Sequence, residues 1–353
     1  MGAPDVALSP DELAYYSRQL VLSEIGLKGQ RRLKKARALV AGVGGLGCQI
    51  AVQLASMGVG YIRLADRDIV EMSNLQRQHL YGFDVIGYPK VEAAEMRLHK
   101  VNPFIEIDPL PMSVNDRTAA KLVDGVDLVV DGLDRLAPRL AVNRACVEHN
   151  IPYIYGAVIT HVGNVSTIIP GKTACLECWQ GGVDEANVPT CATVGVTPSA
   201  ISVIASIQVS EAIRLILGSE PKLAGKLAFF DLDDLSLEKV NLAKAKSCGV
   251  CGDGRKGKKK RLDAVEEICG RDGKRVFTIT PDGWTDQGSL PTEESFTDNG
   301  LRQTLRTRLG VTFSGPSGVK GSIFNTGVAV FEGLDSRAKA VAIYKKLTGV
   351  DAE

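Results

Sequence analysis

A glycine-rich turn between a short apolar strand and an apolar helix constrains the fold of this chain more than any other feature. The turn is Gly42-Val43-Gly44-Gly45-Leu46-Gly47, with a buried strand predicted before it at 36–43, a helix after it at 47–57 and a second strand at 58–64. In such a βαβ unit the glycines let the backbone approach phosphates at the amino terminus of the helix. Strands and helices go on alternating as far as Asp131. This alternation predicts an α/β fold with a doubly wound, mostly parallel, Rossmann-like sheet whose sites lie at the carboxyl ends of its strands.

A polar motif farther along the chain indicates that this turn does not belong to an ordinary dinucleotide site. The motif is Ser73-Asn74-Leu75-Gln76-Arg77-Gln78, and Lys90 follows it. Asn74, Arg77 and Lys90 supply an amide and two cations, which suit a triphosphate whose α-phosphorus is to be attacked. The combination indicates ATP-driven activation of a carboxyl group. Two alternatives stay open: a nicotinamide-dependent oxidoreductase, which the glycine turn and Asp66 alone would support, and a non-catalytic scaffold.

Length and composition limit the class of protein. A chain of 353 residues, 44% of them apolar, predicts one large domain and one small domain with a substantial core. The net charge of +1 implies no global attraction to nucleic acid or to a membrane surface. The first residues lack the pattern of a signal peptide, and apolar runs such as 201–207 are too short and too interrupted by serine to span a bilayer. We therefore expect a cytoplasmic protein without a membrane partner.

The second half of the chain changes character. Two or three strands are predicted at 153–169, a helix at 198–217 and a strand at 227–232. The basic run 255–261 predicts a solvated linker, because no aromatic residue is interleaved to stack bases; a nucleic-acid arm is the alternative. Residues 262–353 predict a small α/β domain with a strand at 275–279, a helix at 299–309, a hairpin at 322–331 and a closing helix at 336–347.

Two C-x-x-C pairs stand out among the eight cysteines. Four thiolates gathered in this way form a closed tetrahedral zinc site, which stabilises a fold rather than catalysing a reaction. A redox pair is the competing interpretation. The predicted zinc ligands are Cys175, Cys178, Cys248 and Cys251. Cys48 and Cys146 fall on apolar helix faces and are predicted to be core residues, whereas the pattern around Cys269 indicates no role.

Taken in order, these motifs resemble those of the activating-enzyme family that includes MoeB, ThiF and the ubiquitin-activating enzymes. The resemblance covers about residues 10–254, so residues 1–254 are expected to form an adenylation domain with a crossover loop near 180–196. The elements that carry it are Tyr16-Ser17-Arg18-Gln19, Gly42–Gly47, Asp66-Arg67-Asp68, Ser73–Gln78, Gly87-Tyr88-Pro89-Lys90, Asn102-Pro103, Asp131–Asp134 and the two cysteine pairs.

The resemblance implies a role for each polar residue of the ATP site. Asp66 would accept hydrogen bonds from the ribose hydroxyls of ATP. Asp134 would hold Mg²⁺, a hard cation that prefers carboxylate and phosphate oxygens. The family commonly has Asn after that aspartate, whereas this chain has Arg135, which puts the neighbouring contact in doubt. The residues that would hold the triphosphate are Asn74, Arg77 and Lys90.

Arg18 and Cys191 would act at a distance from that set. In related enzymes an N-terminal arginine reaches the partner's ATP site, so Arg18 implies a homodimer. Relatives that form a thioester place the nucleophile in a loop matching Thr190-Cys191, before a helix whose N-terminus would lower the thiol pKa. The alternative for Cys191 is a small, partly buried residue that adenylation does not require.

These features together imply an ATP-dependent enzyme that adenylates the C-terminal Gly-Gly carboxylate of a ubiquitin-like β-grasp protein. A thioester on Cys191 would then pass the protein to a conjugating enzyme. The alternative is adenylation of a sulfur-carrier protein for molybdopterin, thiamine or tRNA thiolation. Because residues 262–353 lack a rhodanese-type cysteine loop, we expect that domain to recruit a protein partner.

Overall fold

The computed structural model describes residues 7–184, 194–253, 263–269, 275–282 and 288–351. A large sheet has the strand order β3-β2-β1-β4-β5-β6-β7-β8, parallel from β3 through β5 and antiparallel from β5 to β8. Its strands are β1 Arg37–Ala41, β2 Tyr61–Ala65, β3 Glu106–Leu110, β4 Leu128–Asp131, β5 Tyr153–Ile159, β6 Val162–Ile168, β7 Lys226–Asp231 and β8 Ser236–Asn241. The predicted doubly wound α/β fold is confirmed, with an antiparallel extension on one side.

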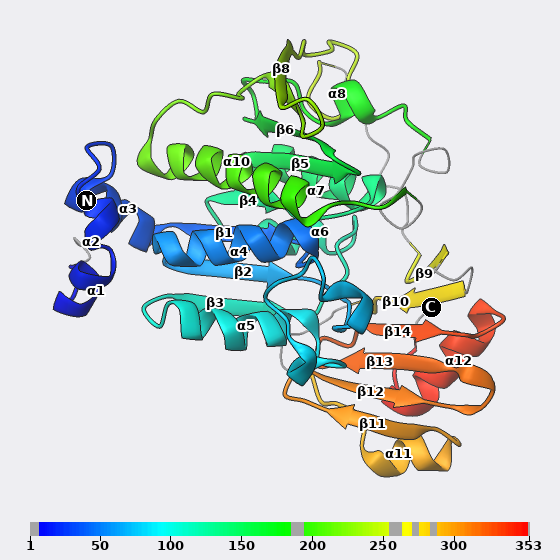
Figure 1. The fold of residues 1–353 in the computed structure, drawn as a ribbon. Coiled ribbons are helices and arrows are strands. Elements are labelled where there is room, and N and C mark those ends of the chain that lie inside the picture. The colour runs from blue at the N-terminus through cyan, green and yellow to red at the C-terminus, as the bar shows by residue number, and fades with distance from the viewer. Residues whose placement is uncertain (1–6, 185–193, 254–262, 270–274, 283–287, 352–353) are drawn as a thin grey trace.

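Helices cover both faces of this sheet (Figure 1). One face carries α4 (Gly45–Met57), α5 (Lys90–Val101) and α10 (Pro198–Leu217), and the other carries α6 (Ala119–Val123) and α7 (Leu136–His149). Side chains of β1 alternate between the two cores: Ala38 and Val40 lie in the first, and Leu39 and Ala41 in the second. A parallel strand covered on both faces must be apolar throughout, which is why residues 38–41 carry no polar side chain.

Helix α10 is long and apolar enough to cross a membrane by length and composition alone. Its packing accounts for that composition, because it contacts α4, β5 and β6 as a core helix. Its buried Gln208 donates to the Asp131 carbonyl, and its buried Glu211 accepts from Thr167. These contacts within the sheet make α10 part of the domain core.

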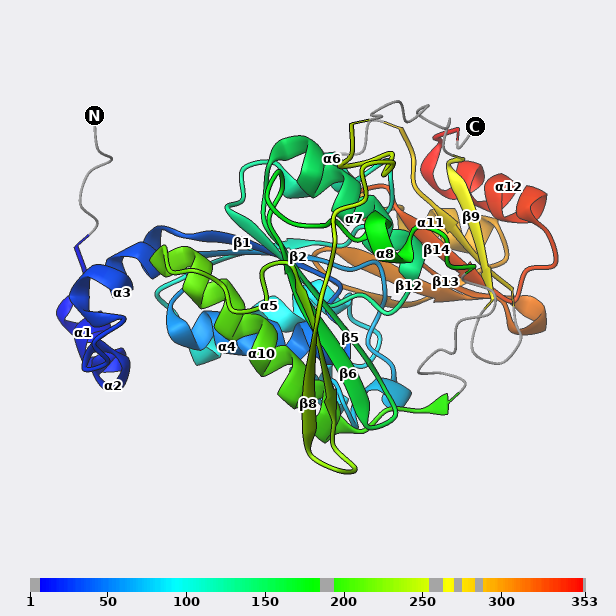
Figure 2. The same cartoon turned by 90° about the horizontal axis from the view of Figure 1, so that it is seen from above.

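The N-terminal segment forms three helices: α1 (Pro10–Tyr15), α2 (Ser17–Leu20) and α3 (Gly26–Lys35). These helices lie at the end of the sheet opposite the carboxyl ends of β1 and β2 (Figures 1 and 2). Gln19 fixes them there by donating to the carbonyl of Met57, the last residue of α4.

The C-terminal residues form a second, antiparallel sheet with the order β11-β12-β13-β14-β10-β9. Its elements are β9 Val265–Cys269, β10 Arg275–Ile279, α11 Glu293–Asp298, β11 Arg302–Arg306, β12 Gly310–Ser314, β13 Lys320–Phe324, β14 Ala329–Glu332 and α12 Arg337–Thr348. The prediction of a helix at 299–309 is wrong, because that segment forms β11. The predicted hairpin and closing helix are confirmed. This domain lies beside the carboxyl ends of β2 and β3 (Figure 1).

Candidate functional site

The glycine turn connects β1 to α4 and packs tightly against its surroundings. Gly42 has φ +85°, and a Cβ there would lie 2.8 Å from the carbonyl oxygen of Gly132, which follows β4. A Cβ on Gly47 would lie 1.9 Å from the Gly42 carbonyl oxygen. Among the described residues no side chain caps α4, so its first N–H groups face the turn. Such an uncapped N-terminus beside a close-packed turn is suited to a phosphate group.

Asp66 follows β2 and is fixed by backbone N–H groups. Its Oδ2 accepts from Val43 of the glycine turn at 2.7 Å, and its Oδ1 accepts from Asp68 at 2.8 Å. Burial raises the pKa of Asp66, whereas the charge of Lys90 and these two hydrogen bonds lower it. Each carboxylate oxygen keeps a second lone pair, which suits the predicted contact with ribose hydroxyls.

Lys90 is the first residue of α5, and its side chain returns toward β2. Its ammonium lies 2.8 Å from Oδ2 of Asp68, and the residue is 3% exposed. Burial opposes ionisation, but the charges of Asp68, Asp66 and Asp134 outweigh it and raise the pKa of Lys90. The lysine therefore stays charged, and the effect of Asp134 places that carboxylate within electrostatic range.

Asp134 belongs to a loop after β4 that a buried ion pair supports. Arg139 Nε lies 3.0 Å from Oδ2 of Asp131, which also accepts from the Tyr153 hydroxyl at 2.9 Å. Arg139 donates further to the carbonyls of Leu133 and, at 2.8 Å, Gly156. The loop thus holds Asp134 exposed at the sheet end. An exposed carboxylate oxygen beside a phosphate site fits Mg²⁺.

The motif 73–78 forms a compact turn beside the glycine loop. Asn74 is buried, and its Oδ1 accepts from Glu71 N–H, so its side chain caps the short helix η1 (Met72–Asn74). Arg77 donates to the carbonyl of Ser73 at 2.9 Å. Gln78 is buried with its amide nitrogen near Gly44, and within the described part of the chain its Oε1 has no hydrogen-bond partner.

Arg18 does not join this group within one chain. It lies exposed on α2, which is tied through Gln19 to the far end of α4. Thirteen residues of α4 separate that end from the glycine turn, a distance of about 20 Å. No arginine side chain spans that distance.

Cys191 lies outside the described residues, so its role stays a prediction. The chain that follows it rejoins the large sheet where β5 ends: Val196 pairs with Thr160, and Thr160 donates to the carbonyl of Gly195. Thr197 then caps α10 by accepting from Ala200. Cys48 and Cys146 are buried in the two cores of the large sheet, as predicted. The side chain of Cys269 also lies outside the described part.

The two cysteine pairs come together beside the second core of the large domain. All four sulfur atoms lie within 4.8 Å of one another, with Cys175 to Cys248 at 3.7 Å and Cys178 to Cys251 at 3.4 Å. Tetrahedral zinc with Zn–S bonds of about 2.3 Å needs sulfur separations of about 3.8 Å. Burial raises the pKa of Cys175 and Cys251, whereas at Cys248 backbone N–H groups outweigh burial and lower the pKa to about 7, and a bound cation would favour the thiolate form of all of them. The site therefore fits a structural zinc.

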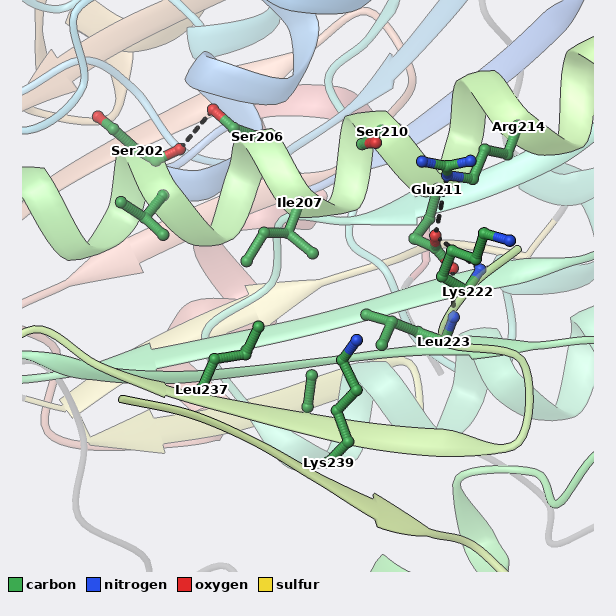
Figure 3. Close-up of a pocket in the computed structure, with 12 residues that line it drawn as sticks. Ser202, Ser206, Ile207, Ser210, Glu211, Arg214, Lys222, Leu223, Leu237 and Lys239 are labelled. Atoms are coloured by element: carbon green, nitrogen blue, oxygen red, sulfur yellow. Dashed lines mark hydrogen bonds and ion pairs between the residues drawn. The ribbon is translucent and has the colours of Figure 1, made fainter. Parts of the chain in front are cut away.

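A cavity of about 530 Å³ lies elsewhere, between α10 and the β7–β8 hairpin (Figure 3). Ser202, Ser206 and Ser210 line one side, and Leu237 and Lys239 line the other. None of the predicted site residues that the structure describes lines this cavity. It is therefore separate from the predicted ATP site.

The sequence pattern did not assign roles to Gln78, Asp68, Asp131 or Arg139. The first three lie in motifs on which the family resemblance rests, so membership in those motifs could have marked them as site residues. Arg139 carried no such signal, because an arginine outside every motif is expected to be a solvated side chain. Only the fold shows that it is buried against Asp131.

Comparisons with known proteins agree with this geometry. Residues 16–250 match the model of the ThiF family. The SAMP-activating enzyme E1 of Haloferax volcanii is 35% identical over 264 residues, which cover 74% of this chain and 95% of that protein. The molybdopterin-synthase adenylyltransferase of Escherichia coli is 37% identical over 247 residues, which cover 69% of this chain and 98% of that protein. The crystal structure of E. coli MccB with ATP superposes with a TM-score of 0.60 at 29% identity, covering 68% of this chain and 75% of that chain. This chain therefore belongs to the ThiF family.

Proposed function

We propose that this chain is an ATP-dependent activating enzyme that adenylates the C-terminal Gly-Gly carboxylate of a ubiquitin-like or sulfur-carrier protein. The observation that carries the proposal is the convergence of one cation and three carboxylates on the glycine turn, where β1, β2 and β4 end. The names of the relatives support it, since they are enzymes that activate or adenylate carrier proteins.

The chemistry is one displacement at phosphorus. A carboxylate oxygen of the carrier attacks the α-phosphorus, and the bond to the bridging oxygen breaks, so that pyrophosphate leaves with the electron pair. The amino terminus of α4 and Lys90 would stabilise the negative charge on the phosphates. Asp66 would orient the ribose, and Asp134 would hold Mg²⁺, which neutralises charge on the departing pyrophosphate.

Arg18 would complete the site in a homodimer. From the far end of α4, Arg18 cannot reach the glycine turn of its own chain. A two-fold axis perpendicular to α4 would place the far end of this helix beside the glycine turn of a second copy. Next to Arg18, the side chain of Val21 is 81% exposed, and Leu22 and Leu27 are also exposed. Covering these apolar side chains with a second copy would bring Arg18 to the partner's glycine turn.

The step after adenylation separates two functions. In the modifier branch the Cys191 thiolate displaces AMP, and a conjugating enzyme in the cytoplasm receives the resulting thioester. In the sulfur-carrier branch hydrosulfide or an equivalent sulfide-level nucleophile displaces AMP, and the carrier becomes a thiocarboxylate. We favour the modifier branch by a small margin, because residues 262–353 contain Cys269 but no rhodanese-type loop.

Exchange of labelled pyrophosphate into ATP tests adenylation. The purified chain is given Mg-ATP and a panel of β-grasp proteins ending in Gly-Gly, each paired with a version that lacks the last glycine. We expect exchange with at least one intact carrier and none with its truncated form; no exchange with any carrier would refute the proposal. Intact mass of the wild type and of Cys191→Ala then separates the branches, because only a thioester adds a carrier mass that thiols remove.

A further inference from the structure

A turn of the C-terminal domain reaches the first helical turn of α5, the helix that carries Lys90. The turn joins β11 to β12 and closes on itself, since Thr307 N–H donates to the carbonyl of Gly310 and Gly310 N–H donates to Thr307 Oγ1. This leaves the N–H groups of Arg308 and Leu309 pointing out of the turn. They form a small concave donor site of the kind that binds an anion.

Glu92 of α5 occupies that donor site. Its Oε1 accepts from Arg308 N–H and its Oε2 from Leu309 N–H, both at 3.0 Å, and the residue is 5% exposed. A carboxylate that uses both oxygens on two backbone donors is held in one orientation. Arg308 also pairs through its side chain with Glu95, one turn farther along α5.

The contact is apolar as well as polar. Leu309 belongs to the small domain but is buried in the hydrophobic core of the large one. Around it glycine backbones approach side chains of the other domain closely: a Cβ on Gly310 would lie 3.0 Å from Pro89 Cγ, and a Cβ on Gly87 would lie 3.2 Å from Leu305 Cδ2. The turn therefore packs against the residues that lead into Lys90.

Lys90 depends on that same segment. Its backbone N–H donates to the Asp68 carbonyl while its ammonium binds the Asp68 carboxylate, and Pro89 bridges to Ile69. A shift of residues 87–92 would move the ammonium relative to Asp66 and the glycine turn. A second contact joins the two domains just after β2 ends. There Glu266 pairs with Arg67 at 3.3 Å and accepts a hydrogen bond from Asn115.

We propose that Glu92 is a positioning residue for Lys90, and that through it the C-terminal domain forms a fixed part of the phosphate site. Glu92 touches no substrate. It ties α5 to the turn 307–310 and so fixes the position of the Lys90 backbone, from which the ammonium reaches the site. This inference rests on the proposed function, because it assumes that Lys90 binds the phosphates of ATP.

Binding measurements on the full chain test the proposal without a carrier protein. Titration calorimetry gives the Kd of Mg-ATP, and competition gives that of adenosine, which has no phosphate. Glu92→Gln keeps the shape but sets an amide N–H₂ against backbone donors, and Leu309→Ala loosens the same contact from the other domain. The matched control is Glu293→Gln, an exposed glutamate in the first turn of α11.

We expect Glu92→Gln and Leu309→Ala each to weaken Mg-ATP binding by about tenfold, with adenosine within about twofold of wild type. Both substitutions act through one contact. The Kd of the double variant for Mg-ATP should therefore be no more than about twofold higher than that of whichever single variant binds more weakly. Glu293→Gln should match wild type. Should Glu92→Gln fail to fold, Leu309→Ala decides the question in the same assay.

Two results would overturn the inference: an unchanged Kd for Mg-ATP, or an equal loss for Mg-ATP and adenosine, which would show a general structural role. A wild-type chain that binds no Mg-ATP would overturn the proposed function itself. The wild-type titration therefore distinguishes failure of the function from failure of the positioning role.

Discussion

Replacing Arg139 with methionine tests whether the buried ion pair with Asp131 supports the site. Asp131 is fully buried, and Arg139 is 8% exposed, so the variant leaves a carboxylate with no opposing charge. Breaking a buried pair from one side costs about 3–5 kcal/mol. Methionine fills much of the volume, so little of that cost comes from a cavity.

The pH dependence of the loss has a definite sign. Burial raises the pKa of Asp131, and Arg139 opposes that rise, so removing Arg139 raises the pKa further. A carboxyl whose pKa is higher in the folded than in the unfolded protein destabilises the fold above that pKa and stops doing so once protonated. The deficit of Arg139→Met should therefore be smaller at an acidic pH that protonates Asp131 in the variant than at about pH 8.

Urea unfolding with zinc present, at both pH values, measures this deficit. The control is Arg337→Met, which breaks an exposed ion pair with Asp263 and should cost under about 1 kcal/mol. At a cost near 4 kcal/mol the melting temperature of Arg139→Met should fall by about 10 °C. A loss below about 1 kcal/mol, or a deficit that does not change with pH, would refute the assignment of this pair as the support of the Asp134 loop.

Further outcomes follow from the same structure. Lys90→Met should lower the rate of carrier-dependent pyrophosphate exchange by about 100-fold, and an unchanged rate would remove Lys90 from the site. Native mass spectrometry of the wild-type chain should find a single zinc, which Cys251→Ser should lose while melting at a lower temperature; a wild type without zinc would contradict this. Mixing inactive Arg18→Ala with inactive Lys90→Met should restore exchange, because a mixed dimer has one complete site; no recovery after subunit exchange would count against action in trans.

The sequence predicted an element well where its apolar pattern fitted either a helix or a strand, and poorly where the pattern fitted both. Helix α10 was placed at its observed bounds, because a long apolar helix has few alternatives. The segment 299–309 was wrong for a physical reason. Leu301, Leu305 and Leu309 recur every four residues, which fits one face of a helix and equally the inward positions of a strand. Pairing of β11 with β12 decides between them, and that contact is not visible locally.

Candidate site residues could be predicted where a motif followed the end of a strand. They could not be predicted where the role of a residue depends on contacts with distant parts of the chain. Asp66 and Lys90 were predicted from their places in the chain; the structure bonds Asp66 to the glycine turn and places Lys90 within electrostatic range of that aspartate, while their roles stay predictions. Glu92 reads in sequence as a solvated residue in the first turn of a helix. Its role depends on backbone N–H groups contributed from the other domain, more than two hundred residues later.

The balance of charge around Lys90 sets a requirement on the nucleotide. Asp66, Asp68 and Asp134 all act on this one lysine, so the carboxylates around Lys90 outnumber it three to one before a nucleotide binds. A bare triphosphate would bring further negative charge to it, and Lys90 cannot bind a phosphate fully while it pairs with Asp68. A divalent cation held by Asp134 would resolve both conflicts, because it would neutralise carboxylate and phosphate charge together and would let Lys90 exchange Asp68 for a phosphate oxygen. We therefore predict that the three carboxylates make the site selective for the metal complex of ATP over the free nucleotide.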